Sequence, residues 1–405
     1  MRGLLTVATA VLFLAACGEG ARKLAAPEVT TLPNGAIEVK NTGPSAWADT
    51  TGWKLVELFR VGGAGAEGTP GELVDPQSIT LDAAGGLYVV DQKPAVIKQF
   101  NPGGAYVRSF GREGGGPGEF EAASIATAPG VLVVHDPSSS RTSVFDSTGT
   151  FLRSWNSACC YYGMIGVSRD GVIAVPTSAQ SSGGIRPGEA HFVRHRLDGS
   201  LVDTLHIAGP DGVDQPQRWT LSAGGGSGSG PTMMMTIPLT PAVRSALDPT
   251  GGAVIGWSGA YRFISTRTGL DTTQIVTLET APAEVTDSRR IRIRDSMAER
   301  FGKQFDRKIV DEAFKLSDIP STAPYFESLA VDGQENRWIR RDDGGNPAAA
   351  QFDVFDSTGA YLGAVPVPQA FGRWYNTSWG SDRVATIAED AEGLPVVVVY
   401  GIERR

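Results

Sequence analysis

The chain has 405 residues, a formal net charge of −8 and only three cysteines. No cluster of Lys and Arg stands out along it, which argues against a nucleic-acid-binding protein, and so few cysteines exclude a fold held together by disulfides. We therefore expect a globular body stabilised by its hydrophobic core, with no nucleic acid among its partners.

The N-terminus, MRGLLTVATAVLFLAACGEG, has the pattern of a targeting segment. Arg2 is followed by an apolar run of 13 residues, Leu4 to Ala16, which suits a signal peptide and is short for a membrane span. The run ends in LAAC, which resembles the bacterial lipobox. That resemblance implies removal of residues 1–16, lipidation of Cys17 and, from Gly18, a location at the outer membrane, facing the periplasm or the surface. An ordinary secretory signal is the alternative.

Residues 17–52 are predicted to form a tether that contains a small hairpin. In VTTLPNGAIEV, the Asn34-Gly35 pair is a strong signal for a tight turn between two strands. The hairpin either packs on the flank of the following domain or serves as a spacer from the membrane.

Residues 53–405 contain one pattern six times, a tight turn followed by an apolar run rich in β-formers, as in LDAAGGLYVVD. A short strand precedes most copies, and another strand and a second turn follow, so each unit contains about four short strands. This repetition predicts an all-β fold, a six-bladed β-propeller of four-stranded antiparallel blades. The copies lie at 81–91, 127–136, 168–176, 247–257, 331–341 and 388–400.

The two ends of the chain are predicted to close the ring. We place the innermost strand of the sixth unit at ATIA, 385–388, and the chain then stops before an outermost strand. WKLVELFRV, 53–61, has no unit of its own and supplies the missing strand, which removes an open sheet edge.

The segment GREGGGPGEF, 111–120, has the glycines of a phosphate-binding loop, but a strand follows it instead of a helix. A second copy, VGGAGAEGTPGEL at 61–73, precedes the first unit, so we interpret both as connectors between blades. Together with LYVVD and the F-x-x-x-G hairpins, this connector resembles NHL-type six-bladed propellers. The resemblance implies a fold and no particular reaction, because such propellers include protein-binding platforms and related ones include enzymes.

Two insertions interrupt the repeat. Residues 221–236, LSAGGGSGSGPTMMMT, are predicted to be a flexible loop between blades 3 and 4. Residues 282–320 have helical spacing and are predicted to form one bent or two short helices between blades 4 and 5, capped by Asp287 or Ser288 and bent at Gly302. These helices lie over one face of the propeller, either as a lid or as a decoration that buries part of the flank.

The histidines do not have the spacing of a metal site. His191 and His195 share a strand but lie about 13 Å apart along it. The other two histidines are His206 and His135, which stands next to Asp136. We predict no cofactor, leaving calcium open because oxygen ligands leave little trace in a sequence. Asp91 and the matching Asp136 are expected to order a turn. Cys159 and Cys160 form either a vicinal disulfide or two small buried residues.

Aromatic and charged residues gather where the blades begin, and such side chains anchor recognition surfaces. We predict a monomeric, lipid-anchored module that binds or scaffolds a protein, peptide or carbohydrate. The alternative is a propeller hydrolase or lyase acting on a small extracellular substrate, with calcium in one version. The candidate ligand-binding residues are Glu121, Tyr161, Tyr162, Arg244, Tyr325, Glu327, Trp374 and Tyr375.

Overall fold

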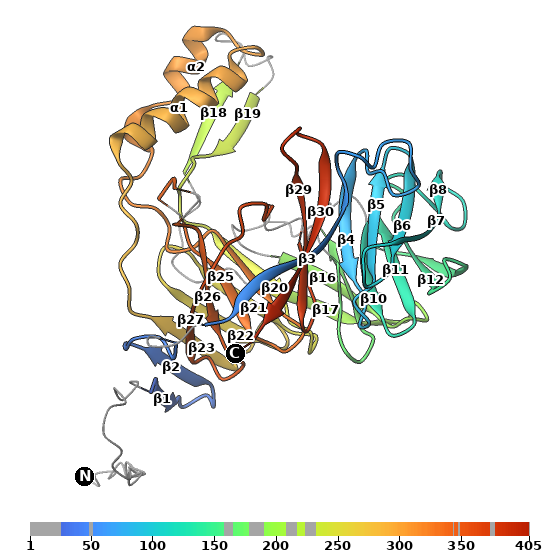
Figure 1. Ribbon diagram of the computed structural model, residues 1–405. Helices are drawn as coiled ribbons and strands as arrows, with labels where there is room; N and C mark the ends of the chain where they lie inside the picture. The colour runs from blue at the N-terminus through green and yellow to red at the C-terminus, as the bar shows by residue number, and fades with distance from the viewer. Residues whose placement is uncertain are drawn as a thin grey trace, which may run out of the picture.

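The protein is a ring of six four-stranded antiparallel blades, as the sequence predicts (Figure 1). The computed structural model describes residues 26–47, 52–157, 165–177, 190–207, 217–222, 232–342, 344–346, 349–372 and 377–404. Cys17, Cys159 and Cys160 lie outside these ranges. No helix among the described residues is long and apolar enough to cross a membrane.

The blades follow one another along the chain, and each begins with its innermost strand. Blade 1 consists of β4 (Pro76–Leu81), β5 (Leu87–Gln92), β6 (Ala95–Phe100) and β7 (Tyr106–Phe110). Blade 2 consists of β10 (Ser124–Ala128), β11 (Val131–Asp136), β12 (Arg141–Asp146) and β13 (Phe151–Asn156). Blade 3 consists of β14 (Gly166–Val167), β15 (Ile173–Thr177), β16 (Ala190–His195) and β17 (Leu201–Ile207).

Blades 4 to 6 complete the ring. Blade 4 consists of β20 (Val243–Leu247), β21 (Ala253–Trp257), β22 (Arg262–Thr266) and β23 (Gln274–Leu278). Blade 5 consists of β24 (Ser328–Val331), β25 (Arg337–Arg340), β26 (Gln351–Phe355) and β27 (Tyr361–Pro366). Blade 6 consists of β28 (Thr377–Trp379), β29 (Arg383–Glu389), β30 (Pro395–Glu403) and the N-terminal β3 (Lys54–Gly62).

The N-terminal strand β3 closes the ring as predicted. It pairs with β30, from Lys54 opposite Glu403 to Gly62 opposite Val396. The prediction for the sixth unit was nevertheless wrong by one strand. ATIA, 385–388, belongs to the second strand, β29, and the innermost strand is β28.

Alternating apolar residues of neighbouring blades form the core. On β11, Leu132 and Val134 pack toward blade 1, whereas Val133 packs toward blade 3. The strands are therefore buried on both faces, which explains their nearly continuous apolar runs. The connector GREGGGPGEF packs in the same way, since Phe120 is buried between blades 1 and 2. Its ends form β8 (Arg112–Glu113) and β9 (Glu119–Phe120), which pair in parallel.

The predicted N-terminal hairpin extends blade 4. β1 (Glu28–Thr31) and β2 (Ile37–Asn41) are antiparallel around Gly35, which has a positive φ of 84°. β2 then pairs in parallel with β23, the outermost strand of the blade. Figure 1 shows this hairpin near the bottom of the ring.

The two insertions fold together into one unit, which we call the cap. It comprises α1 (Asp287–Phe301), α2 (Arg307–Ala313), a 3-10 turn (Leu316–Asp318) and a hairpin of β18 (Arg218–Ser222) and β19 (Thr232–Thr236). Figure 1 shows the cap projecting from the top of the ring beside blades 4 and 5.

Three details of the prediction for the insertions were wrong. Residues 232–236 form a strand instead of a flexible loop, while the Gly/Ser run at 223–231 lies outside the described ranges. The helices bury their apolar face against the hairpin, with Phe314 on Trp219 at 4.8 Å between ring centroids, instead of lying on the propeller. The N-cap of α1 is Thr286, which accepts the backbone N–H of Arg289, instead of the predicted Asp287 or Ser288. Gly302 ends α1, so the insertion forms two helices.

Candidate functional site

The two ends of the ring differ in their construction. At the connector end, where the chain passes from each blade to the next, the cap projects. At the opposite end, Arg169 of blade 3 donates to Glu335 Oε1 at 2.5 Å and to the Gly333 carbonyl at 2.6 Å, both in blade 5. Its backbone N–H also donates to the Pro249 carbonyl of blade 4 at 2.8 Å. Arg169 thus straps the turns of three blades together across that end.

Behind this strap is a small cavity of about 150 Å³. Its charged lining residues already have partners, since Arg194 pairs with Asp203 at 2.5 Å and Asp332 accepts from Arg404 at 2.8 Å. The candidate residues that the structure describes, Glu121, Arg244, Tyr325 and Glu327, lie at the connector end, where the blades begin.

Two of the predicted residues, Arg244 and Glu327, meet at the junction of blades 4 and 5. Arg244 lies on β20 and shares the strand face of Ala246, which packs toward blade 5. Its Nε donates to the Glu327 carbonyl at 2.6 Å. Partial burial lowers the pKa of Arg244, and the charge of nearby Glu327 only partly offsets this effect.

The side chain of Glu327 turns toward a different arginine. Arg340, at the end of β25, brings its Nε to 3.5 Å from Glu327 Oε2, and the two residues are also joined by a backbone hydrogen bond of 2.8 Å. Arg340 was not among the predicted site residues. The signal was present in the fifth repeat, VDGQENRWIRR, whose final arginines come at the connector end of the strand.

Tyr325 packs between blades 4 and 5. Its ring lies 6.2 Å from that of Tyr261, and its backbone N–H donates to the Ser258 carbonyl at 2.9 Å. Tyr261 in turn belongs to a buried polar cluster around Asp353, which accepts its hydroxyl at 2.6 Å and pairs with Arg341 at 2.6 Å. Burial, with the carboxylate of Asp353 second, raises the pKa of Tyr261 well above its usual value.

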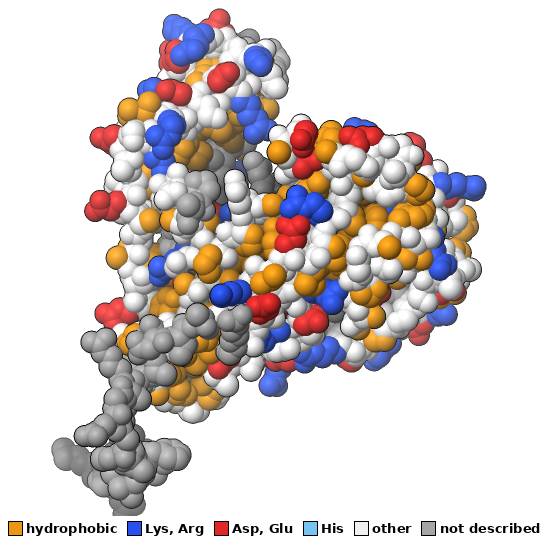
Figure 2. Space-filling model, in the orientation of Figure 1, with side chains coloured by type: hydrophobic (Ala, Val, Ile, Leu, Met, Phe, Trp, Pro, Cys, Tyr) orange, Lys and Arg blue, Asp and Glu red, His pale blue; other side chains and the backbone are white. Residues whose placement is uncertain are grey.

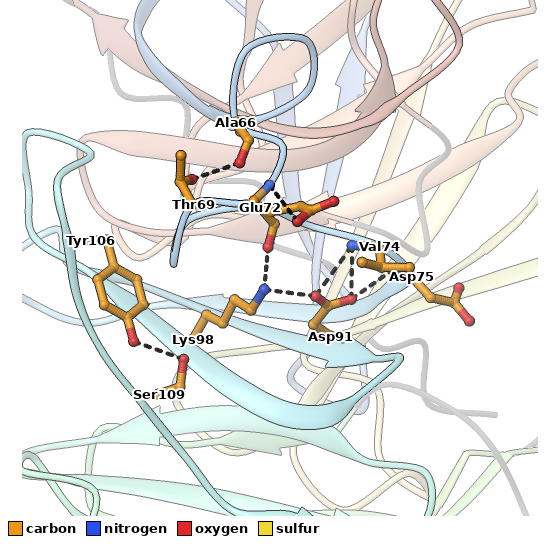
Figure 3. Close-up of polar contacts among 10 residues, drawn as sticks. Ala66, Thr69, Glu72, Val74, Asp75, Asp91, Lys98, Tyr106 and Ser109 are labelled. Carbon is orange, nitrogen blue, oxygen red and sulfur yellow. Dashed lines mark hydrogen bonds and ion pairs between the residues drawn. The ribbon is translucent and has the colours of Figure 1, made fainter.

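Asp91 holds the first connector in place and does not face an open site (Figure 3). Its carboxylate accepts the backbone N–H groups of Val74 and Asp75 and pairs with Lys98 at 3.0 Å. Lys98 also donates to the Glu72 carbonyl. The carboxylate is fully buried, so the expectation that it orders a turn is confirmed.

Glu121 lies at the connector end between blades 1 and 2. Its backbone N–H donates to Asp136 Oδ2 at 3.0 Å, the same tie that Asp91 makes one blade earlier, and its side chain is exposed. Glu121 is therefore available to a ligand but belongs to a different junction from Arg244. Four other candidates lie outside the described residues: Tyr161, Tyr162, Trp374 and Tyr375.

The histidines are spread over two blades. His191 and His206 face each other on β16 and β17 with stacked rings 4.0 Å apart, while His195 Nδ1 lies 3.2 Å from the Gly199 carbonyl. His135 is buried in blade 2, where burial lowers its pKa to about 4. Within the described ranges, no three His, Cys, Asp or Glu side chains gather as metal ligands do.

No family model and no curated protein matches this chain. Among solved structures, an exported protein of Bacteroides fragilis is similar at 11% identity, with a TM-score of 0.45, over 91% of this chain and 99% of its own. A member of the DUF4221 family from Bacteroides vulgatus is similar at 11% identity, with a TM-score of 0.48, over 87% of this chain and 99% of its own. Virginiamycin B lyase of Staphylococcus aureus is similar at 12% identity, with a TM-score of 0.38, over 86% of this chain and 99% of its own.

Proposed function

We propose that this protein is a lipid-anchored propeller of the bacterial cell envelope that binds a protein, peptide or carbohydrate at the connector end of the ring. The observation that carries the proposal is the difference between the two ends. Arg169 straps one end, whereas the other presents the cap, the junction of Arg244 with Glu327, and the exposed Glu121. Binding sites in ring-shaped folds suit the end where side chains from several blades remain accessible.

The direction of the N-terminus agrees with this proposal. Figure 1 shows β1 and β2 near the bottom of the ring, away from the cap. Ala26 comes nine positions after Cys17, and a chain of that length reaches at most about 30 Å. A lipid on Cys17 would therefore hold the hairpin near the outer membrane and point the connector end away from it.

The surface of the cap suits a binding role. Figure 2 shows a notch between the cap and the tops of β29 and β30, and Lys and Arg interspersed with Asp and Glu on the cap. Met233 and Met234 of β19 are 36% and 60% exposed. Methionine side chains adapt to partners of different shape, which is why they are frequent on binding surfaces.

The proposal is tested by photocrosslinking from the two ends of the ring. A benzophenone amino acid is placed at Glu121, at the connector end, or at Thr250, an exposed position in the opposite turn of blade 4. The full lipidated chain in detergent is then offered a random peptide library and a panel of oligosaccharides. We expect retained probes to crosslink at position 121 and not at 250. Retention with crosslinks only at 250, or no retention of any probe, would contradict the proposal.

No contact among the described residues favours the alternative of a hydrolase or lyase, and that alternative stays a prediction. Metal analysis of the purified chain tests its calcium-dependent version.

A further inference from the structure

Four arginines lie at the connector end of the junction of blades 4 and 5 or in the adjoining cap, and one of them differs from the rest. A fifth, Arg337, lies at the opposite end of β25, where it donates to the Asp356 carbonyl and to Ser265 Oγ. Three of the four have carboxylate partners: Arg289 with Asp342 (2.7 Å), Arg340 with Glu327 (3.5 Å) and Arg341 with Asp353 (2.6 Å). Arg244 has none within ion-pair distance among the described residues, and its side chain donates to a backbone carbonyl instead.

The free part of the Arg244 guanidinium is its outer edge. Nε is used by the Glu327 carbonyl, whereas neither Nη1 nor Nη2 has a hydrogen-bond partner in the described part of the chain. Both nitrogens keep some solvent-accessible surface. The side chain is thus fixed at one nitrogen and presents two parallel donors outward.

A partly buried guanidinium without a carboxylate is costly, because burial removes water that would otherwise solvate its charge. The lowered pKa of Arg244 has the same cause. A planar carboxylate satisfies both outer nitrogens at once in a bidentate pair, the strongest form of this hydrogen bond. The charge of the nearby Glu327 carboxylate offsets the loss of water only in part, and a ligand carboxylate in direct contact would supply the rest.

We propose that Arg244 binds a carboxylate of an acidic peptide at the connector end of the ring. This inference rests on the proposed function and specifies its ligand. A peptide is favoured over a sugar because the exposed apolar side chains of the cap hairpin are Met233 and Met234. Tyr261 and Tyr325, whose flat rings would suit a sugar, instead pack between the blades.

The test compares matched pairs of fluorescent hexapeptides that differ only in a carboxylate. In each pair, Asp, Glu or a free C-terminus is replaced by Asn, Gln or a C-terminal amide, and binding to the full chain is measured by polarisation. We expect wild-type protein to bind the acids roughly ten- to a hundredfold more tightly than the amides. R244M should bind both alike, R244K should keep part of the difference, and the exposed control R153M should behave as wild type.

Several outcomes would overturn the inference. Equal affinity of wild type for acid and amide, or discrimination that survives in R244M, removes the role of Arg244. Binding of glucuronate oligosaccharides without binding of acidic peptides assigns the site to a sugar, and displacement by inorganic phosphate but not by acetate assigns it to phosphate. If R244M does not fold, the wild-type pairs and R244K still decide. Crosslinking at position 121 without acid preference refutes this inference alone and leaves the proposed function standing.

Discussion

The ion pair of Arg289 with Asp342 is predicted to fasten the cap to the ring. The pair is bidentate, with distances of 2.7 and 2.9 Å, and joins the first turn of α1 to the loop after β25. The side chain of Asp342 is 1% exposed and that of Arg289 is 11% exposed. The D342A substitution removes the bidentate carboxylate partner of a largely buried guanidinium, which costs about 3 kcal/mol.

This cost should fall on the cap, because the cap has its own core of Trp219, Phe301 and Phe314. A loss of about 3 kcal/mol raises the equilibrium constant for local opening roughly a hundredfold. We expect amide hydrogens of α1 to exchange with deuterium faster by that factor, while those of β5 and β11 keep their protection.

The double variant R289M/D342L is the matched control. Replacing both charges by apolar side chains of similar size should restore protection, since no unpaired charge remains. Unchanged exchange in α1 of D342A, or an equal acceleration in the blades, would refute the view that this pair fastens a separately packed cap.

Three further predictions concern the ring and the anchor. Burial lowers the pKa of His135 to about 4, so as the pH falls this side chain takes up a proton in the unfolded state while it stays neutral in the folded state. The free energy of unfolding should therefore fall by about 3 kcal/mol between pH 7 and pH 4 because of His135. Denaturant titrations of H135N measure this, and a pH dependence equal to that of the wild type would contradict it. The D91A substitution leaves Lys98 buried without its carboxylate partner and should lower the free energy of unfolding by about 3–5 kcal/mol. A loss under about 1 kcal/mol would contradict the role of Asp91 in holding the connector. Cys17 should incorporate an alkyne-labelled fatty acid in a bacterial host and C17S should not, while labelling of both would place the lipid elsewhere.

The ring was predictable from sequence because its strands are local. Each blade is built from consecutive hairpins with Asp, Asn and Gly at the turns, and the closing strand followed from a count of strands. The error in blade 6 arose because turns at both ends of a blade share the same chemistry. Asp390 accepts the N–H groups of Glu392 and Leu394 between the second and third strands, as Asp82 does for Ala84 and Gly86 between the first and second. The pattern therefore does not distinguish the two positions.

The cap was only half predictable. Helical spacing identified α1 and α2, but the Gly/Ser run beside Met233 obscured β19. That strand depends on contacts distant in sequence: Met235 pairs with Trp219, and Trp219 donates to Asp318 from a position 99 residues earlier in the chain. Composition within a short window carries no information on such contacts.

The candidate site was predictable by residue type and not by arrangement. Arg244 and Glu327 were selected because they lie where blades begin, yet their contact spans 83 residues. The role of Arg340, and the difference between Arg244 and its neighbours, follow only from which carboxylate each arginine reaches. Pairing between blades decides this, and no local pattern encodes it.

Hydroxyl-radical footprinting of the full chain, with and without an acidic peptide selected in the polarisation assay, tests most directly that the connector end is the binding end. Our account predicts that the peptide protects Met233, Met234 and Tyr325, whose oxidation reports on the cap and the junction of blades 4 and 5, and leaves Leu270 unprotected at the opposite end. Protection confined to Leu270 and the turns around it, with unchanged oxidation of the two methionines and Tyr325, would contradict it.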